Sequence, residues 1–312
     1  MAPSSWARGR LPRRERRQAL LFLSPWLVGF AALVAYPVGA SLYYSFTRYD
    51  GLSSPRWVGL DNYRFMLTTD PLFWKAVRNT LWLVAIAVPL QALLALGLAL
   101  LLNGVRRGLG TYRTVFYLPA IAPLVAATLA FSYLLDPAAG PVNQLLHRLH
   151  LPEPLWFFDP AFAKPGLTLL SLWGVGPAMI VFLAGLSAIP QDLYEMAAVE
   201  GAGPWQRFRH VSLPKLSPFI LFVGLAGVIE AFGYFTQAYV AARVASPGTA
   251  LPGSPEGSTL FYSVLLYKRA FLDIRLGYAS AMAWLLLALS LVAVLVLLRA
   301  TRSVVHYGAE QE

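Results

Sequence analysis

The sequence lacks cysteine and is poor in charged residues. Asp, Glu, Lys and Arg make up 13% of the 312 residues, against roughly 25% in soluble domains. The absence of cysteine excludes disulfides and thiolate metal sites. The net charge of +10 does not indicate a nucleic-acid partner, because no basic stripe with interleaved aromatic residues accompanies it. With a hydrophobic fraction of 57%, the composition indicates a membrane protein.

The sequence also lacks the motifs of the common catalytic sites. A P-loop needs a glycine directly before its lysine, and none of the four lysines follows a glycine. Neither an H-E-x-x-H zinc motif nor a G-x-S-x-G nucleophile motif is present. His147 and His150 lie three apart in a predicted loop, where two histidines without further ligands are interpreted as solvated residues. We therefore expect no catalytic residue, no metal site and no cofactor bound by this chain.

Long apolar runs predict an all-α membrane protein with six transmembrane helices, since each span needs about 20 apolar residues. The predicted spans are 20–46, 80–102, 114–135, 166–188, 219–242 and 277–298. The first run is too long for a signal peptide and has no clear cleavage site, so we interpret it as a retained span. Prolines at positions 25, 37 and 89 lie inside predicted spans, and Pro119 and Pro123 interrupt the third. In the segment after the first span, Asp61 is expected to cap a short helix that runs through Leu67.

The charges suggest an orientation with both termini inside. Three domains follow from the spans: a basic tail (1–19), the six-span domain (20–298) and a C-terminal tail (299–312). The segments then assigned to the inside hold 14 Lys and Arg in 74 residues, whereas the outer ones hold 11 in 95 residues. This bias has the direction of the positive-inside rule. We expect a multi-pass protein of the bacterial inner membrane with cytoplasmic termini.

A polar stretch, residues 189–218, separates two strongly apolar runs and predicts two short helices. Pro190 suits the first position of a helix, and Gly201 suits its C-terminal end. Pro204 can start a second helix, whose length Pro214 and Pro218 are expected to limit. From the pattern alone, this is either a contact surface for another protein or an amphipathic hairpin on the membrane.

Residues of two kinds make the stretch suitable for protein contact. Small residues allow a close approach, and they are Ala197, Ala198, Gly201 and Ala202. Glu195 and Glu200 could pair with basic groups on a partner. In the second helix, Trp205, Phe208 and Val211 recur every third residue and predict one apolar face.

A polar stripe is predicted in the fifth span. Glu230 lies at membrane depth, where a carboxylate is costly and usually faces a cavity or a partner. Tyr234 and Gln237 follow at i+4 and i+7, so a helix would place all three on one face. This face could line a path for a hydroxyl-rich solute, with Tyr117 and Trp173 adding polar or aromatic character. The alternative is that the stripe packs against another helix.

Residues 189–218 resemble the EAA loop of permease subunits of bacterial ABC importers, whose pattern is E-A-A-x-x-x-G followed by I-x-L-P. The residues in register are Glu195, Ala197, Glu200, Gly201, Ala202, Phe208, Val211, Leu213 and Pro214. Met196 replaces the usual first alanine, and Glu200 the usual aspartate. The resemblance covers nearly the whole chain and favours the carbohydrate-type branch. The stretches that carry it are WVGLDNYRFML (57–67), FWKAVRNTLW (73–82), YLPAIAP (117–123) and LGYASAMAWLL (276–286).

The resemblance implies a type I importer fold and half of a heterodimeric pore for a sugar. The partners would be a second permease, a solute-binding protein and two ATP-binding cassette subunits, which would bind ATP and Mg²⁺. The coupling residues would be Glu195, Met196, Ala197, Ala198, Glu200, Gly201, Ala202, Phe208, Leu213 and Pro214. A polyol, a glycerol-phosphate derivative or an amino sugar is the alternative cargo. Outside the family, an ion-coupled secondary transporter or a membrane enzyme stays open, although neither internal repeats nor a catalytic constellation is evident.

Overall fold

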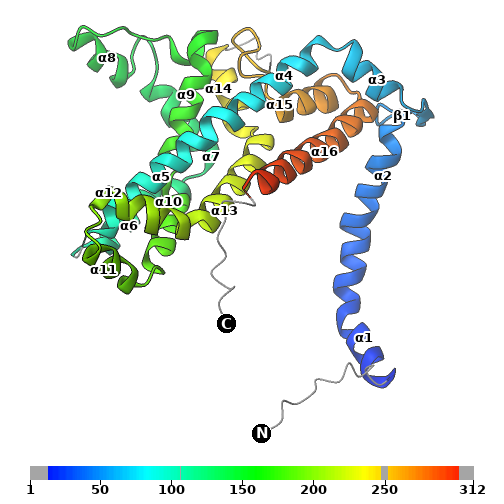
Figure 1. Cartoon of the computed structure of the whole chain (residues 1–312). Helices are drawn as coiled ribbons and strands as arrows, with labels where there is room; N and C mark the ends of the chain where they lie inside the picture. The colour runs from blue at the N-terminus through cyan, green and yellow to red at the C-terminus, as the bar shows by residue number, and fades with distance from the viewer. Residues whose placement is uncertain (1–12, 106, 247–251, 302–312) are drawn as a thin grey trace.

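The computed structural model describes residues 13–105, 107–246 and 252–301, and the chain is mostly helical across them (Figure 1). The α-helices are α1 (Arg13–Phe30), α2 (Tyr36–Ser45), α3 (Asp61–Thr68), α4 (Pro71–Trp82), α5 (Val88–Asn103), α6 (Leu109–Ile121), α7 (Leu124–Leu134), α8 (Pro141–Arg148), α9 (Pro160–Trp173), α10 (Gly176–Ser187), α11 (Gln191–Val199), α12 (Pro204–Arg207), α13 (Leu213–Phe232), α14 (Thr236–Ala245), α15 (Tyr262–Tyr267) and α16 (Leu276–Thr301). Two short strands, β1 (Thr47–Arg48) and β2 (Arg56–Trp57), pair antiparallel. Most of the predicted N- and C-terminal tails lies outside the described residues.

Length and hydropathy give six candidate spans. Four are continuous helices: Leu21–Ser45, Pro71–Asn103, Pro204–Phe232 and Leu276–Thr301. Two are bent pairs: α6 with α7, and α9 with α10. With each bent pair counted as one span, the candidates agree with the six-span prediction in number and order, although the fourth and fifth predicted spans differ in shape.

Three of the prolines inside the continuous spans follow widened helical turns. Three π-helical turns each end two residues before a proline. They are η1 (Ala31–Ala35), η2 (Leu83–Ala87) and η4 (Phe208–Ser212), followed by Pro37, Pro89 and Pro214. A proline lacks an N–H and clashes with the carbonyl one turn earlier, and a π-helical turn relieves both problems by shifting the hydrogen-bond pattern. The prediction that Pro214 and Pro218 limit the second helix of the polar stretch is therefore wrong, because the helix runs unbroken from Pro204 to Phe232.

The bent spans break at glycine and proline. The third span breaks where Pro119 and Pro123 predicted it, with α6 and α7 at 97° to each other. The fourth was predicted as one helix, but α9 and α10 meet at 49°. Gly174 ends α9, and the backbone of Gly176 lies against the backbone of Phe116, where a side chain would collide. The close approach to α6 therefore needs glycine at position 176.

The fifth predicted span is also interrupted. The helix α13 ends at Phe232, and Gly233 follows with backbone angles outside the helical region. A second helix, α14, begins only at Thr236. The prediction of one helix over 219–242 is therefore wrong, because Gly233 terminates it within the apolar run.

Helix capping differs from the prediction for Asp61. Leu60 is the N-cap of α3, and Asp61 lies inside the first turn without a capping hydrogen bond. The capping aspartates are Asp70 and Asp159. Their carboxylates accept from the backbone N–H groups two residues later, at 3.0 Å for Asp70 and 2.8 Å for Asp159.

A buried ion cluster ties the starts of α4 and α16 to the π-helical turn η5 (Lys268–Leu272). The Asp70 side chain is 1% exposed; its Oδ2 accepts from Arg269 Nη2 at 2.7 Å and from the Tyr278 hydroxyl at 2.8 Å. Asp273 in turn accepts from Arg269 Nη1 at 2.8 Å and from Lys268 at 2.7 Å. The cluster therefore joins segments that lie about two hundred positions apart in the sequence.

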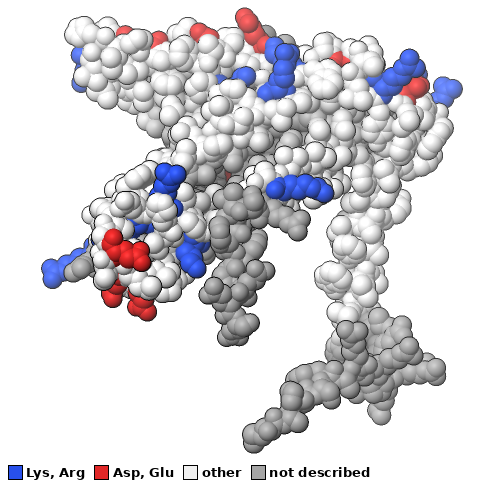
Figure 2. Space-filling model, viewed as in Figure 1, with Lys and Arg blue, Asp and Glu red and all other residues white. Residues whose placement is uncertain are grey.

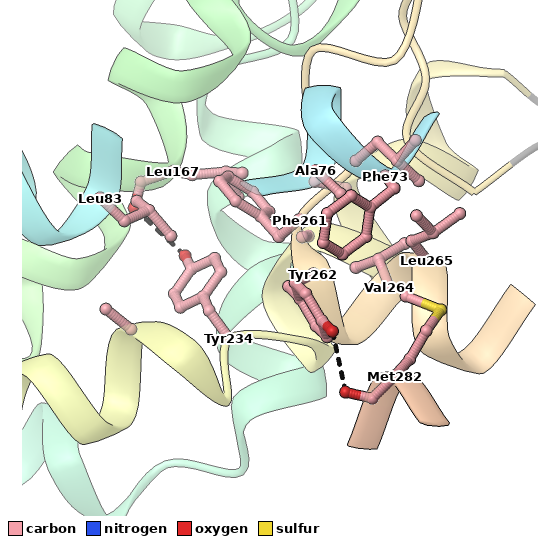
Figure 3. Packing of buried hydrophobic residues seen from close by; sticks show 14 of the residues in the cluster. Phe73, Ala76, Leu83, Leu167, Tyr234, Phe261, Tyr262, Val264, Leu265 and Met282 are labelled. Atoms are coloured by element: carbon pink, nitrogen blue, oxygen red, sulfur yellow. Dashed lines mark hydrogen bonds between the residues drawn. The ribbon is translucent and has the colours of Figure 1, made fainter. Parts of the chain in front are cut away.

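The core consists of two clusters of buried residues. One lies among α4, α9, α15 and α16, with Phe73, Phe261 and Tyr262 at its centre (Figure 3). The Tyr262 hydroxyl donates to the Met282 carbonyl at 2.8 Å, so its burial costs no lost hydrogen bond. The other cluster packs α5 against α10 and α13, where Ala95 and Ala99 on α5 let the helices approach closely.

The first half of the N-terminal span projects away from the other helices. No residue is buried in the most apolar window of Leu21–Ser45, and Figure 1 shows α1 standing apart, whereas α2 packs against α16. At the opposite side of the view, the hairpin of α11 and α12 lies at one end of the bundle, and α3, α8 and α15 lie at the other. In Figure 2, most charged side chains gather near these two ends, which leaves a largely uncharged surface between them.

Candidate coupling hairpin and cavity

The hairpin of α11 and α12 is built around a glycine turn. Gly201 has φ of +79°, and its N–H bonds to the Ala198 carbonyl at 3.0 Å. The N–H of Ala202 bonds to the Ala197 carbonyl at 2.9 Å. This pair of hydrogen bonds is the Schellman ending of a helix, in which glycine takes the left-handed position. The predicted helix end at Gly201 is confirmed, and Pro190 is the N-cap rather than the first helical residue.

Side chains fix the second half of the hairpin. Gln206 Oε1 accepts from the Gly203 N–H at 2.7 Å, which caps α12 at the residue before Pro204. Arg207 Nε donates to the Ala202 carbonyl at 2.8 Å and so ties α12 back to the glycine turn. The Tyr194 hydroxyl lies 2.9 Å from Ser212 Oγ, which joins α11 to η4. These contacts could not be predicted from the sequence, because they join residues 3 to 18 positions apart across a turn of unknown angle.

The hairpin exposes apolar and acidic side chains together. The exposed fractions are 63% for Met196, 90% for Val199 and 69% for Trp205. Glu195 and Glu200 are also exposed, and none of the ion pairs among the described residues includes either of them. Apolar groups and unpaired carboxylates exposed on one small surface indicate a protein partner.

The predicted coupling residues fall into an exposed and a packed group. Glu195, Met196, Ala198, Glu200 and Gly201 are exposed, whereas Ala197, Ala202, Phe208 and Pro214 are half-buried. The ring of Phe208 packs at 5.4 Å from that of Trp205, and Leu213 begins α13. The hairpin therefore presents α11 outward and uses η4 to anchor itself to α13.

A cavity of about 380 Å³ lies where the two bent spans meet the break between α13 and α14. Residues from each break line it: Ala122 and Leu124, Trp173 and Gly174, and Tyr234. Irregular backbone at membrane depth is tolerated only where it is buried in protein or lines a cavity. Each break brings one helix C-terminus and one helix N-terminus to this cavity, which leaves backbone polar groups near it.

Glu230, Tyr234 and Gln237 all line this cavity, but not as one helical face. The predicted i, i+4, i+7 stripe is wrong, because α13 ends between Glu230 and Tyr234. Tyr234 is buried, packs edge-on against Phe261 at 5.4 Å, and directs its hydroxyl to the Leu167 carbonyl at 3.5 Å (Figure 3). Tyr234 thus belongs mainly to the core, and Glu230 and Gln237 are the more accessible of the three.

Two further polar residues complete the cavity. Gln91 on α5 and Ser171 on α9 line it with Trp173, whose ring is 42% exposed. Sequence reasoning missed Gln91 and Ser171, although Gly174, Gly176 and Pro177 signalled a broken span beside them. Tyr117 lies on α6 outside the cavity lining and is 40% exposed.

Comparison with known proteins identifies the family. Residues 91–305 match the family described as binding-protein-dependent transport system inner membrane component. The chain belongs to this family.

Relatives cover nearly the whole permease. It is 38% identical to the probable ABC transporter permease protein YesP of Bacillus subtilis, over 96% of this chain and 95% of the relative. It is 33% identical to the diacetylchitobiose uptake system permease protein NgcF of Streptomyces coelicolor, over 93% and 85%. It is 32% identical to the sulfoquinovosyl glycerol transport system permease protein SmoG of Agrobacterium fabrum, over 93% and 92%. The family decides against the ion-coupled secondary transporter that the sequence left open.

A solved structure confirms the fold. The permease superposes on a chain of a bacterial ABC transporter involved in the import of the acidic polysaccharide alginate, with a TM-score of 0.77 and 24% identity. The match covers 96% of the permease and 100% of that chain. The expected type I importer permease fold is thereby confirmed.

The described part of the permease contains no group of three His, Asp or Glu residues that could hold a metal ion. His147 instead lies 2.7 Å from Glu153, as a partly exposed pair on α8 and the loop after it. His150 makes no side-chain contact of this kind within the described ranges.

Proposed function

We propose that the permease forms one half of the translocation pore of an ATP-driven sugar importer, beside a second, related permease. The cavity between the two bent spans and the break that separates α13 from α14 is the observation that carries this proposal. The family membership supports delivery of the cargo by an extracytoplasmic solute-binding protein. Two relatives, NgcF and SmoG, are named for sugar cargoes, which supports a sugar rather than another solute.

The lining of the cavity has the chemistry of a sugar site. Its volume lies within the range of about 300–1,000 Å³ typical of small-molecule sites. Gln91, Ser171 and Gln237 offer groups that can pair with hydroxyls, and Trp173 offers an aromatic face on which a sugar ring can stack. Apolar side chains make up most of the remaining lining, so the second permease supplies further polar contacts.

Coupling to ATP hydrolysis runs through the hairpin. Two ATP-binding cassette subunits hold ATP and Mg²⁺, and each receives one such hairpin, from this permease or from its partner. The small residues around Gly201 allow the close approach, and Met196 and Val199 become buried in the contact. Glu195 makes a charge-assisted hydrogen bond worth about 1.5–3 kcal/mol. Closure of the ATPase dimer moves the hairpins together, and the pore opens outward.

The proposed location is the bacterial plasma membrane with both tails in the cytoplasm. The start of α1 and the hairpin lie toward the same end of the molecule in Figure 1, which supports one side for both. The higher density of Lys and Arg in the predicted inner segments supports the cytoplasm as that side. The helices α3, α8 and α15 then face the solute-binding protein.

The test is co-purification followed by uptake. After gentle detergent extraction, the permease should carry with it an ATPase subunit and a second permease. Glu195→Ala should abolish uptake of the cargo in cells while the amount of assembled permease in the membrane stays unchanged. Glu195→Asp, which keeps the carboxylate, is the matched control and should retain uptake. Extraction without an ATPase, or full uptake in Glu195→Ala, would refute the proposal.

A further inference from the structure

We propose that Glu230 makes the cavity select against anionic sugars, so that the cargo is an uncharged or amino-bearing sugar. This inference rests on the proposed function, because it treats the cavity as the path of a sugar. It narrows the cargo class, and it removes the phosphorylated glycerol derivatives that the sequence left open.

Glu230 is the only ionisable carboxylate among the described residues that line the cavity, and that lining includes no Lys, Arg or His. None of the ion pairs among the described residues includes Glu230. One of these pairs joins His147 to Glu153, and the others belong to the Asp70 cluster. The described part of the chain therefore contributes one acidic side chain and no basic side chain to the wall of the path.

The helix ends do not offset this charge. The N-termini of α7, α10 and α14 lie at the three breaks and would attract an anion. The C-termini of α6, α9 and α13 lie at the same breaks and would repel it by a similar amount. Glu230 is in the last turn of α13, so its charge adds to the negative end of that helix.

The surroundings make the charge effective over several ångströms. Leu83, Val88, Phe222 and Val223 contribute apolar wall to the same cavity. Interactions between charges are several times stronger in such surroundings than in water. A carboxylate or phosphate on the cargo would meet Glu230 without a cation from this chain. Hydroxyl and ammonium groups, by contrast, donate charge-assisted hydrogen bonds to a carboxylate.

Three β-1,4-linked disaccharides of different charge provide the test. They are diacetylchitobiose, which is neutral, chitobiose with its two amines protonated, and cellobiouronic acid, which is anionic. Each is offered in labelled form to the assembled importer in lipid nanodiscs, which leave both sides of the membrane accessible, and binding is measured by equilibrium dialysis without the binding protein. The variants are Glu230→Gln, which keeps the shape and removes the charge, and Glu153→Gln as the control carboxylate outside the cavity.

In the wild type and in Glu153→Gln, we expect the anionic disaccharide to bind at least tenfold more weakly than the neutral one, and the amino disaccharide at least as tightly. In Glu230→Gln, the difference between the anionic and neutral disaccharides should fall below threefold, chiefly through tighter binding of the anion. Equal binding of all three by the wild type would overturn the inference and leave the sugar path standing. An unchanged preference of Glu230→Gln for the neutral over the anionic disaccharide would also overturn the inference and leave the sugar path standing.

If Glu230 instead pairs with a cation of the second permease, Glu230→Gln should lower the yield and thermal stability of the complex. The wild type would then bind the anionic disaccharide as well as the neutral one, which also overturns the inference. Failure of all three to bind an importer that still hydrolyses ATP would overturn both the inference and the sugar path.

Discussion

Removal of the Asp70 charge should destabilise the permease more than removal of any exposed carboxylate. Asp70 is 1% exposed and accepts from Arg269, Tyr278 and the N–H of Leu72. In Asp70→Asn, the amide oxygen can still cap α4, because asparagine is as good an N-cap as aspartate. The loss therefore falls on Oδ2, where the amide NH2 of asparagine can accept neither from Arg269 nor from Tyr278.

The size of the loss follows from the burial of the pair. Removing one partner of a buried ion pair costs about 3–5 kcal/mol, because the other charge stays buried without compensation. Arg269 is 13% exposed and keeps Asp273, so we expect the lower end of this range, about 3 kcal/mol. In the double variant Asp70→Asn with Arg269→Met, no uncompensated guanidinium remains, and most of the stability should return.

The assay is the fraction of assembled complex that survives a series of heating steps, measured by size-exclusion chromatography. Asp61→Asn is the control, because Asp61 is exposed and makes no capping bond; it should change stability by no more than about 0.5 kcal/mol. Equal heat resistance of Asp70→Asn and Asp61→Asn would refute the reasoning. So would a double variant that is weaker than Asp70→Asn alone.

Three further predictions concern the hairpin, the topology and the pH dependence. Gly201→Asn should keep much of the uptake, since Asn tolerates φ of +79°. Gly201→Asp has the same shape and should lose uptake through its charge at the contact surface. Equal losses of uptake in the two variants would exclude the charge as the cause. In intact cells, Leu52→Cys, at a residue 90% exposed, should react with an impermeant thiol reagent, and Gln206→Cys should not; labelling at Gln206 would overturn the orientation. Burial alone would raise the pKa of Asp273, but hydrogen bonds and charges from Lys268 and Arg269 lower it below its ordinary value of 3.8. The stability that ionised Asp273 contributes is therefore full above its ordinary pKa and is lost as the pH falls below that pKa. Acid should thus destabilise the wild type more than Asp273→Asn, and parallel pH profiles of the two proteins would contradict this.

The spans and the hairpin could be predicted from the sequence because their signals are local. The apolar runs set the number of spans, and the glycine at position 201 marks the end of α11. The break at Ala122 and Pro123 was predicted because two prolines lie four residues apart. The wide turn before Pro214 has no such local signal, and so the helix was predicted to end where it continues.

The cavity could be predicted only in part because it depends on where helices break. Glu230 could be predicted as a carboxylate at membrane depth, and Trp173 as an aromatic residue within the fourth predicted span. Gln91 is a single polar residue in an apolar run, and only the packing of α5 against the breaks gives it a role. Tyr234 was assigned to a helical face that Gly233 abolishes, and the residue instead packs into the core.

The π-helical turn η4 sets the rotational phase of the fifth span. A helix advances by about 100° per residue, and a π-helical turn holds one residue more than an α-helical one. Every side chain from Leu213 to Phe232 is therefore rotated by about 100° relative to an uninterrupted helix that begins at Pro204. An α-helical turn in place of η4, formed by the same sequence, would turn Glu230 by about 100° around the helix axis and away from the cavity without changing a single residue in its wall. The orientation of the carboxylate is thus fixed some twenty residues away, in the segment that anchors the hairpin.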